Sequence, residues 1–115
     1  MVNSSETPIF TRYYGFVKWL FERVEKFPKS SRPVLGNRLA SISLEILEQI
    51  VAALYARDKL GILREINLGL ERLRILMRLA KDLRYISISQ LEYGVREANE
   101  VGRMLGGWVK QQQKK

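Results

Sequence analysis

The sequence contains no cysteine and no histidine among its 115 residues. Without cysteine, the chain can form neither a disulfide nor a thiolate metal site. Without histidine, it lacks the commonest metal ligand and the side chain best suited to proton transfer near neutral pH. Carboxylates, hydroxyls and lysines are the only groups left for chemistry, so the catalytic options are already few.

Long apolar runs are also missing. The densest one, residues 50–55, is far shorter than the roughly eighteen residues of a membrane-spanning helix. Residues 1–8 are polar and hold no basic stretch followed by an apolar segment, so no secretory signal is predicted. The sequence therefore predicts a cytoplasmic protein without membrane contact.

Negative charge is scarce. Twelve Asp and Glu residues stand against twenty Lys and Arg residues, which leaves a net charge of +8. Such an excess favours polyanionic partners, most often nucleic acid. The alternative is that the charge only keeps the protein in solution.

Proline and glycine divide the chain into four segments with helical periodicity. We expect helices at about 8–27, 32–58, 61–84 and 90–110, followed by a frayed polar tail at 111–115, all within a single domain spanning 1–115. Thr7 is a good N-cap for the first helix, which begins at Pro8. Because the connections are short, consecutive helices must lie antiparallel, which predicts an all-α, up-down-up-down four-helix bundle.

Apolar residues on the second and third helices exceed what one bundle core needs. Each of these helices carries a main stripe with alternating steps of three and four residues. Further apolar side chains lie outside the stripes, namely Leu44, Leu47, Val51 and Leu54 in the second helix and Leu68, Ile75 and Leu79 in the third. So wide an apolar arc indicates that another subunit or partner covers it.

The fourth helix shows the clearest start signal. Ser89 followed by Glu92 fits a capping box, with Ile88 and Tyr93 as the hydrophobic staple. Gly106 and Gly107 lie near the expected helix end, where glycine usually terminates a helix.

No catalytic or metal constellation is predicted. Glu45 and Glu48 have the spacing of a di-metal bundle, but such sites usually also draw on histidine, so we interpret both as residues of a solvated face. Four serines, Ser30, Ser31, Ser41 and Ser43, have no visible base. We therefore expect a protein that is not an enzyme and that has no cofactor and no metal.

A basic row follows one face of the third helix. Arg74, Arg78 and Lys81 step by four and three residues, and Arg64 lies on the same arc. Intrahelical pairs such as Glu71 with Arg74 would neutralise part of it. The remaining arginines suit phosphate or carboxylate equally well. Since aromatic residues do not alternate with them, contact with the phosphate backbone is favoured over base stacking.

Several strings resemble a known family. FPKS at 27–30 and LGNR at 35–38 are similar to the four-helix proteins that include the ribosome-associated and intervening-sequence proteins. LREIN at 63–67, LERLR at 70–74, MRLAK at 77–81 and VGRMLGGW at 101–108 resemble the accessory variability determinant proteins of diversity-generating retroelements. The resemblance spans about residues 14–110. The chain departs from the family pattern at residues 31–33.

The resemblance implies a basic homopentamer that binds the element's reverse transcriptase and its template RNA and supports mutagenic cDNA synthesis. DNA, through the same phosphate contacts, is a further possible partner. Carried onto this chain, the contact residues implied are Arg64, Arg74, Arg78, Lys81 and Arg103. Two alternatives stay open: a stand-alone RNA-binding or ribosome-associated four-helix protein, and a purely structural oligomer.

Overall fold

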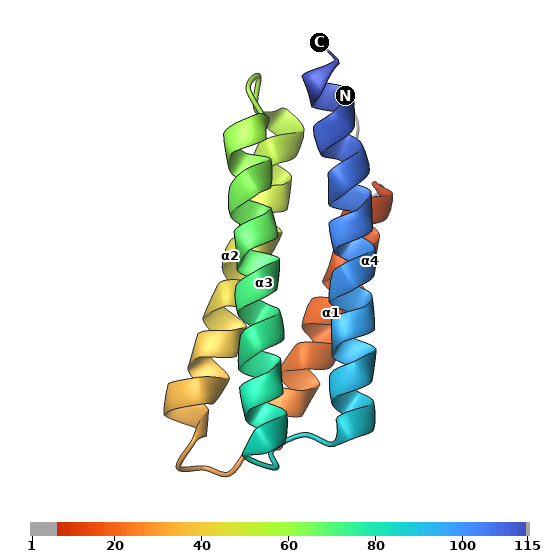
Figure 1. The fold of residues 1–115 in the computed structure, drawn as a ribbon. Coiled ribbons are helices and arrows are strands. Elements are labelled where there is room, and N and C mark those ends of the chain that lie inside the picture. The colour runs from red at the N-terminus through yellow and green to blue at the C-terminus, as the bar shows by residue number, and fades with distance from the viewer. Residues whose placement is uncertain (1–6, 115) are drawn as a thin grey trace.

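The computed structural model describes residues 7–114 and contains four long helices, labelled α1 to α4 in Figure 1. Their bounds are Pro8–Glu25 for α1, Asn37–Tyr55 for α2, Leu60–Asp82 for α3 and Ile88–Gln113 for α4; a π-helical turn, Arg32–Gly36 (η2), leads into α2. Residues 7–114 contain no strand. None of the helices within that range combines the length and apolar character needed to cross a membrane. The prediction of an all-α fold is confirmed.

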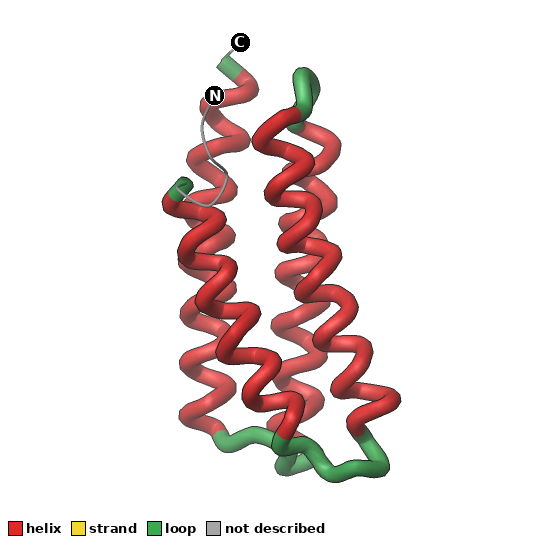
Figure 2. Tube along the Cα trace, turned by 180° about the vertical axis from the view of Figure 1, so that it is seen from behind, coloured by secondary structure: helices red, strands yellow, loops and turns green. Residues whose placement is uncertain are grey.

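The four helices form one elongated bundle of 47 × 22 × 20 Å. Each helix runs antiparallel to the next and packs on it, and α4 closes the bundle against α1 (Figures 1 and 2). The predicted stripes supply the core: Tyr13, Phe16, Leu20, Leu39, Ile42, Ile46, Ile50, Leu63, Ile66, Leu70, Leu73, Met77, Ala98 and Leu105 are at most 2% exposed. The up-down-up-down bundle predicted from the stripes and short connections is therefore confirmed.

One polar contact lies inside this core. The Tyr13 hydroxyl donates to the backbone carbonyl of Ser43 at 2.8 Å, and the Ser43 hydroxyl donates to the carbonyl of Ala40 at 2.8 Å. Burial raises the pKa of the Tyr13 phenol well above its ordinary value, because the charged phenolate is disfavoured away from water. The contact ties α1 to α2 at a fixed height.

The α1–α2 connection differs from the prediction of helices at 8–27 and 32–58. Helix α1 ends two residues early, because the N–H of Lys26 bonds to the carbonyl of Arg23 at 3.1 Å and that of Phe27 bonds to the carbonyl of Val24 at 3.0 Å, in tighter turns. Phe27 nevertheless remains buried. The segment 32–36, which begins within the departure from the family pattern at residues 31–33, is a π-helical turn and not regular α-helix. Gly36 is buried in it, and a Cβ there would come 3.0 Å from Val24 Cγ1.

A lysine closes the other end of α2. The Lys59 ammonium donates to three backbone carbonyls, those of Ala53 at 2.6 Å, Ala56 at 2.8 Å and Leu54 at 3.3 Å. The last carbonyls of a helix have no partner within it and carry partial negative charge. Lys59 thus caps α2 from outside the helix, a role that periodicity does not reveal.

Helix α3 ends in a Schellman motif. The N–H of Tyr85 bonds to the carbonyl of Ala80 at 2.8 Å, and the N–H of Arg84 bonds to that of Lys81 at 2.9 Å. This motif needs a left-handed residue at the position that Arg84 occupies, and Arg84 has a φ of 67°. Glycine is the residue that usually fills such a position, since a Cβ costs about 1–2 kcal/mol there.

The start of α4 corrects the predicted cap. Ser87, and not Ser89, is the N-cap: its hydroxyl accepts from the N–H of Gln90 at 3.1 Å, and the Gln90 side chain accepts from the N–H of Ser87 at 2.8 Å. The staple of Ile88 with Tyr93 is also wrong, because Ile88 is exposed while Ile86, the residue before the cap, is buried. Because Ile86 is buried in the core, the helix begins two residues earlier than predicted, with Ser87 as its N-cap.

The end of α4 corrects a second expectation. The helix runs to Gln113, so residues 111–113 are helical and not a frayed tail; Lys115 lies outside the described residues. Gly106 and Gly107 do not terminate the helix but lie within it, and a Cβ at either would meet no atom within 4 Å. Unbranched glutamines at 111–113 are good helix formers, which accounts for the extension.

Candidate partner-binding surface

The predicted contact residues of α3 differ in exposure and pairing. Arg64 and Arg78 are exposed, and among residues 7–114 neither has an ion-pair or hydrogen-bond partner. Lys81 is half-buried and approaches the neighbouring Asp82 at 3.5 Å. The row therefore contains two unpaired guanidinium groups and one weakly paired ammonium.

Arg74 is held differently, at the seam between α3 and α4. Its Nε donates to Oδ1 of Asn99 on α4 at 2.8 Å, and its Nη1 contacts Glu71 at 3.2 Å. Gly102 leaves room for the guanidinium, since a Cβ there would lie 3.3 Å from Arg74 Nη2. The Glu71–Arg74 pair expected from the sequence is thus present. The contact with Asn99 joins two helices and was not predicted.

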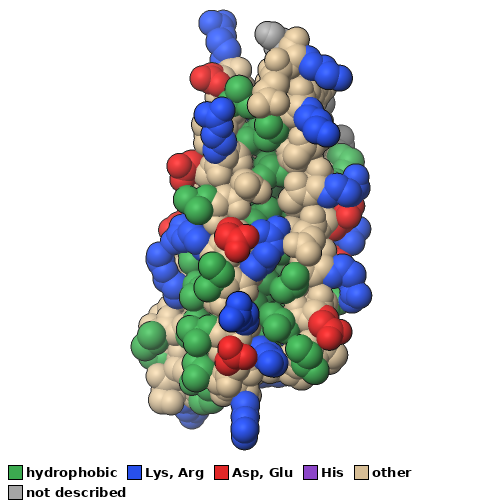
Figure 3. Space-filling model, viewed as in Figure 1, with side chains coloured by type: hydrophobic (Ala, Val, Ile, Leu, Met, Phe, Trp, Pro, Cys, Tyr) green, Lys and Arg blue, Asp and Glu red, His purple; other side chains and the backbone are tan. Residues whose placement is uncertain are grey.

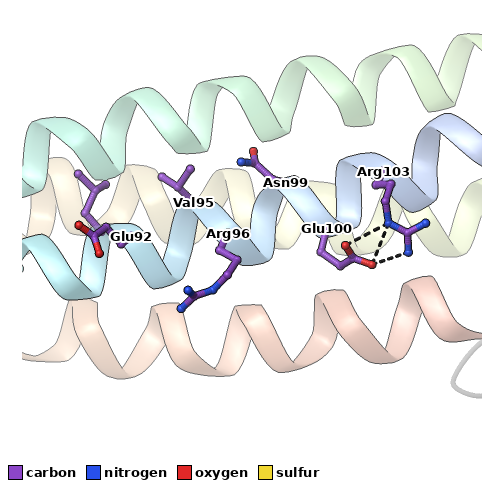
Figure 4. A pocket seen from close by; sticks show the side chains of 7 residues that line it. Glu92, Val95, Arg96, Asn99, Glu100 and Arg103 are labelled. Atoms are coloured by element: carbon purple, nitrogen blue, oxygen red, sulfur yellow. Dashed lines mark hydrogen bonds and ion pairs between the residues drawn. The ribbon is translucent and has the colours of Figure 1, made fainter.

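Arg103 lies on α4 and pairs with Glu100 one turn earlier. Figure 4 shows the two side chains pointing toward one another in a groove that Val95, Arg96 and Asn99 also line. Hydrogen bonding from Arg103 lowers the pKa of the Glu100 carboxyl, and the same bond raises the pKa of Arg103. Arg96 extends away from this pair, with its guanidinium 5.9 Å from the ring of Tyr93.

The structure therefore separates the five predicted residues. Arg74 and Arg103 come close to the same groove of α4, through Asn99 and Glu100, and each is already paired. Arg64 and Arg78 are exposed on α3 and have no ion pair within the described part of the chain. The Arg103–Glu100 spacing of three residues was a signal in the sequence that could have predicted this partial neutralisation.

Large apolar side chains are exposed between the cations of α3. Leu68, Ile75, Leu79 and Leu83 are 56%, 58%, 43% and 48% exposed. In Figure 3 hydrophobic side chains and Lys or Arg side chains are interspersed on this side of the bundle. We call the outward side of α3, with Arg64, Arg78 and these four residues, the α3 face. Arginine beside clustered apolar groups is typical of the central part of protein–protein interfaces.

The seam between α1 and α4 is closed by its own ion pair and aromatic contact. Arg12 contacts Glu97 through two hydrogen bonds of 2.9 Å, and this bonding raises the pKa of Arg12. Trp19 packs on Tyr93 with ring centroids 5.0 Å apart. Trp19 and Trp108 are both partly buried and pack against the core.

The part of the chain described, residues 7–114, offers no group of three Asp or Glu side chains that could hold a metal ion. Glu45 and Glu48, the candidate pair on α2, are both exposed. Their interpretation as solvated-face residues fits this placement.

Comparison with known proteins adds one finding. A family model described as bAvd-like matches residues 9–112. The matched segment takes in the four helices, except for their outermost residues Pro8 and Gln113, and all five predicted contact residues. No curated protein matches the chain.

Proposed function

Since the chain belongs to the bAvd-like family, that of the accessory variability determinants, we propose that it is a non-enzymatic accessory protein of a diversity-generating retroelement. It binds the element's reverse transcriptase and its template RNA through cationic surfaces and so supports mutagenic cDNA synthesis. The cytoplasm is the compartment in which it would meet both partners.

The observation that carries this proposal is the α3 face. Arg64 and Arg78 have no acidic partner among the described residues, and exposed leucines lie beside them. A helix with packed core residues on its opposite side holds these groups at fixed spacing, so little conformational entropy is lost on binding. Recognition of this kind requires complementary shape and charge and no reactive group.

We also propose a homo-oligomer, with five subunits as the family resemblance implies. Leu44 and Tyr55 on α2 are 43% and 56% exposed, and Leu47 and Val51 are half-buried beside them. Contiguous apolar surface of this sort commonly marks an interface. Size-exclusion chromatography with light scattering tests the assembly; a monomer at micromolar concentration would contradict it.

Co-purification with the co-expressed polymerase tests the proposed function. Arg64→Glu with Arg78→Glu should abolish recovery of the polymerase, because an acidic partner surface would then face two negative charges. The matched control is Lys18→Glu with Lys110→Glu, two exposed lysines on α1 and α4, which should leave recovery intact.

Unchanged recovery with the reversed α3 face would exclude that face as the contact. If the unaltered protein never recovers the polymerase yet binds RNA, the stand-alone RNA-binding protein replaces the proposed function.

A further inference from the structure

Positive charge is concentrated in two segments that are far apart in the sequence. Residues 26–38 and 80–90 together hold six Lys or Arg residues and one acidic residue, Asp82. They supply five of the chain's eight net positive charges from fewer than a quarter of its residues. We call these six residues the loop-end cluster: Lys26, Lys29, Arg32, Arg38, Lys81 and Arg84.

The fold brings both segments to one end of the bundle. The α1–α2 and α3–α4 connections lie together at the lower end in Figure 1, and again in the opposite view of Figure 2. The rings of Phe27 and Tyr85, one from each connection, pack with centroids 5.3 Å apart. Arg38 and Tyr85 line the same groove. The cluster is thus one surface, although its halves are about fifty residues apart.

Most of this charge is not neutralised within the chain. Lys26, Lys29, Arg38 and Arg84 have no ion pair among the described residues, and the Nε of Arg32 donates to a neutral carbonyl, that of Phe27. Lys81, with Asp82 at 3.5 Å, is the exception. Glu25 and Glu92, the acids next to the two segments, pair with none of the six.

Helix dipoles do not explain the accumulation. Two helical segments end here, α1 and α3, and two begin here, η2–α2 and α4, so their partial charges largely cancel. Unpaired cations of one sign repel one another and destabilise the folded state. The cluster therefore lowers stability unless something outside the chain neutralises it.

Arg84 gives an independent indication. It occupies a left-handed position, φ 67°, that glycine would fill without steric penalty. Residues held at strained backbone positions concentrate where a ligand or partner is bound. At position 84 the chain has a positively charged arginine where glycine would fit the turn without strain.

We propose that the loop-end cluster is the surface that binds the phosphodiester backbone of RNA, separate from the α3 face, which takes the protein partner. This inference rests on the proposed function and assigns its two partners to two surfaces. The cluster sets six cations against one acid, and all of these cations except Lys81 lack an ion pair among residues 7–114. The α3 face has two unpaired arginines among four exposed apolar side chains, and the exposed Leu83 lies where the two surfaces adjoin. The bundle is 22 × 20 Å across its long axis, wide enough for several consecutive phosphates of one strand.

Fluorescence anisotropy with the full chain tests the assignment. The probes are a labelled single-stranded RNA of 20 nucleotides and an RNA hairpin, each titrated between 50 and 200 mM NaCl. The loop-end variant combines Lys29→Glu, Arg38→Glu and Arg84→Glu. Its matched control reverses three cations near the opposite end, Arg57, Lys110 and Lys114, and changes the net charge equally.

We expect the loop-end variant to lose at least about 30-fold in affinity and the slope of log K against log salt to fall by about 2 to 3, because three phosphate contacts disappear. The control should change affinity by less than about threefold, since at these salt concentrations charges tens of ångströms away are screened. Equal loss with both RNAs identifies the shared backbone, and a difference between them shows which form is bound. Circular dichroism and light scattering confirm that fold and assembly are unchanged.

Four results would overturn the assignment: no RNA binding by the unaltered protein at 50 mM NaCl, unchanged affinity of the loop-end variant, an equal loss in the control, or loss of binding only on reversing Arg64 and Arg78. The loop-end variant should still recover the polymerase. Should it lose the polymerase while keeping RNA, the cluster is a protein contact. In each case polymerase recovery still tests the proposed function separately.

Discussion

Replacing Arg84 by glycine should make the protein more stable while weakening its contact with RNA. A Cβ in the left-handed region costs about 1–2 kcal/mol, and Arg84 has a φ of 67°. Glycine removes that penalty but gives the unfolded chain more freedom, which offsets about 0.5–1 kcal/mol. Within residues 7–114 Arg84 has no ion pair that would be lost. The free energy of unfolding should therefore rise by about 0.5–1 kcal/mol.

Urea and thermal unfolding followed at 222 nm would measure the change at a fixed protein concentration. The midpoint temperature should rise by about 2–5 °C. Arg84→Ala is the matched control, because it removes the same charge but keeps the Cβ. Its stability should stay within about 0.5 kcal/mol of the parent, while its affinity for RNA should fall as far as that of the glycine variant.

Equal stability of the alanine and glycine variants would refute the reasoning, since the two differ only in the Cβ. A glycine variant that is less stable than the parent protein would refute the reasoning even more clearly. It would mean that the Arg84 side chain holds the turn between α3 and α4.

Three further predictions concern the scaffold. Gly106→Ala should raise the free energy of unfolding by about 1 kcal/mol, because the new Cβ would meet no atom within 4 Å. Gly94→Ala should lower the free energy of unfolding, because its Cβ would lie 2.8 Å from Met77 Sδ. Thermal melts in which both variants shift the midpoint temperature in the same direction would contradict this packing. Lys59→Met should lower stability by about 1–2 kcal/mol in urea titrations, since three carbonyls at the end of α2 lose their donor; an unchanged midpoint would show that water replaces the ammonium. Burial raises the pKa of the Tyr13 phenol, so on raising the pH the unfolded chain loses this proton before the folded chain does. The free energy of unfolding should therefore fall as the pH rises above about 10. Tyr13→Phe should show a shallower fall between about pH 9.5 and 11, and identical slopes for the two proteins would rule Tyr13 out as the cause.

The bundle was predictable because its signals are repeated. Each helix carries its own apolar stripe with helical spacing, and proline or glycine marks the connections. A local sequence signal was less decisive where a second, equally good pattern lay close to it. Ser87 with Gln90 and Ser89 with Glu92 both have capping-box spacing, and only the burial of Ile86 selects the first pair.

The pairing of the candidate contact residues was harder to predict, because it depends on how the helices are rotated against one another. Arg74 and Asn99 are 25 residues apart, and no spacing rule joins them. By contrast, Glu100 and Arg103 share a helix and could have been paired from their spacing alone. The loop-end cluster was equally hard to predict, because its members come together only when the fold brings two connections to the same end of the bundle.

Helix α1 starts and helix α4 finishes at the end of the bundle remote from the two cationic connections (Figure 1). Pro8 and Gln111 even line a common groove there. An affinity tag or fluorescent protein attached beyond either helix would thus be directed away from the charged end. Immobilised through such a tag on a sensor chip, every molecule would present the same pole to the flowing analyte, which allows binding to that pole to be measured without blocking it.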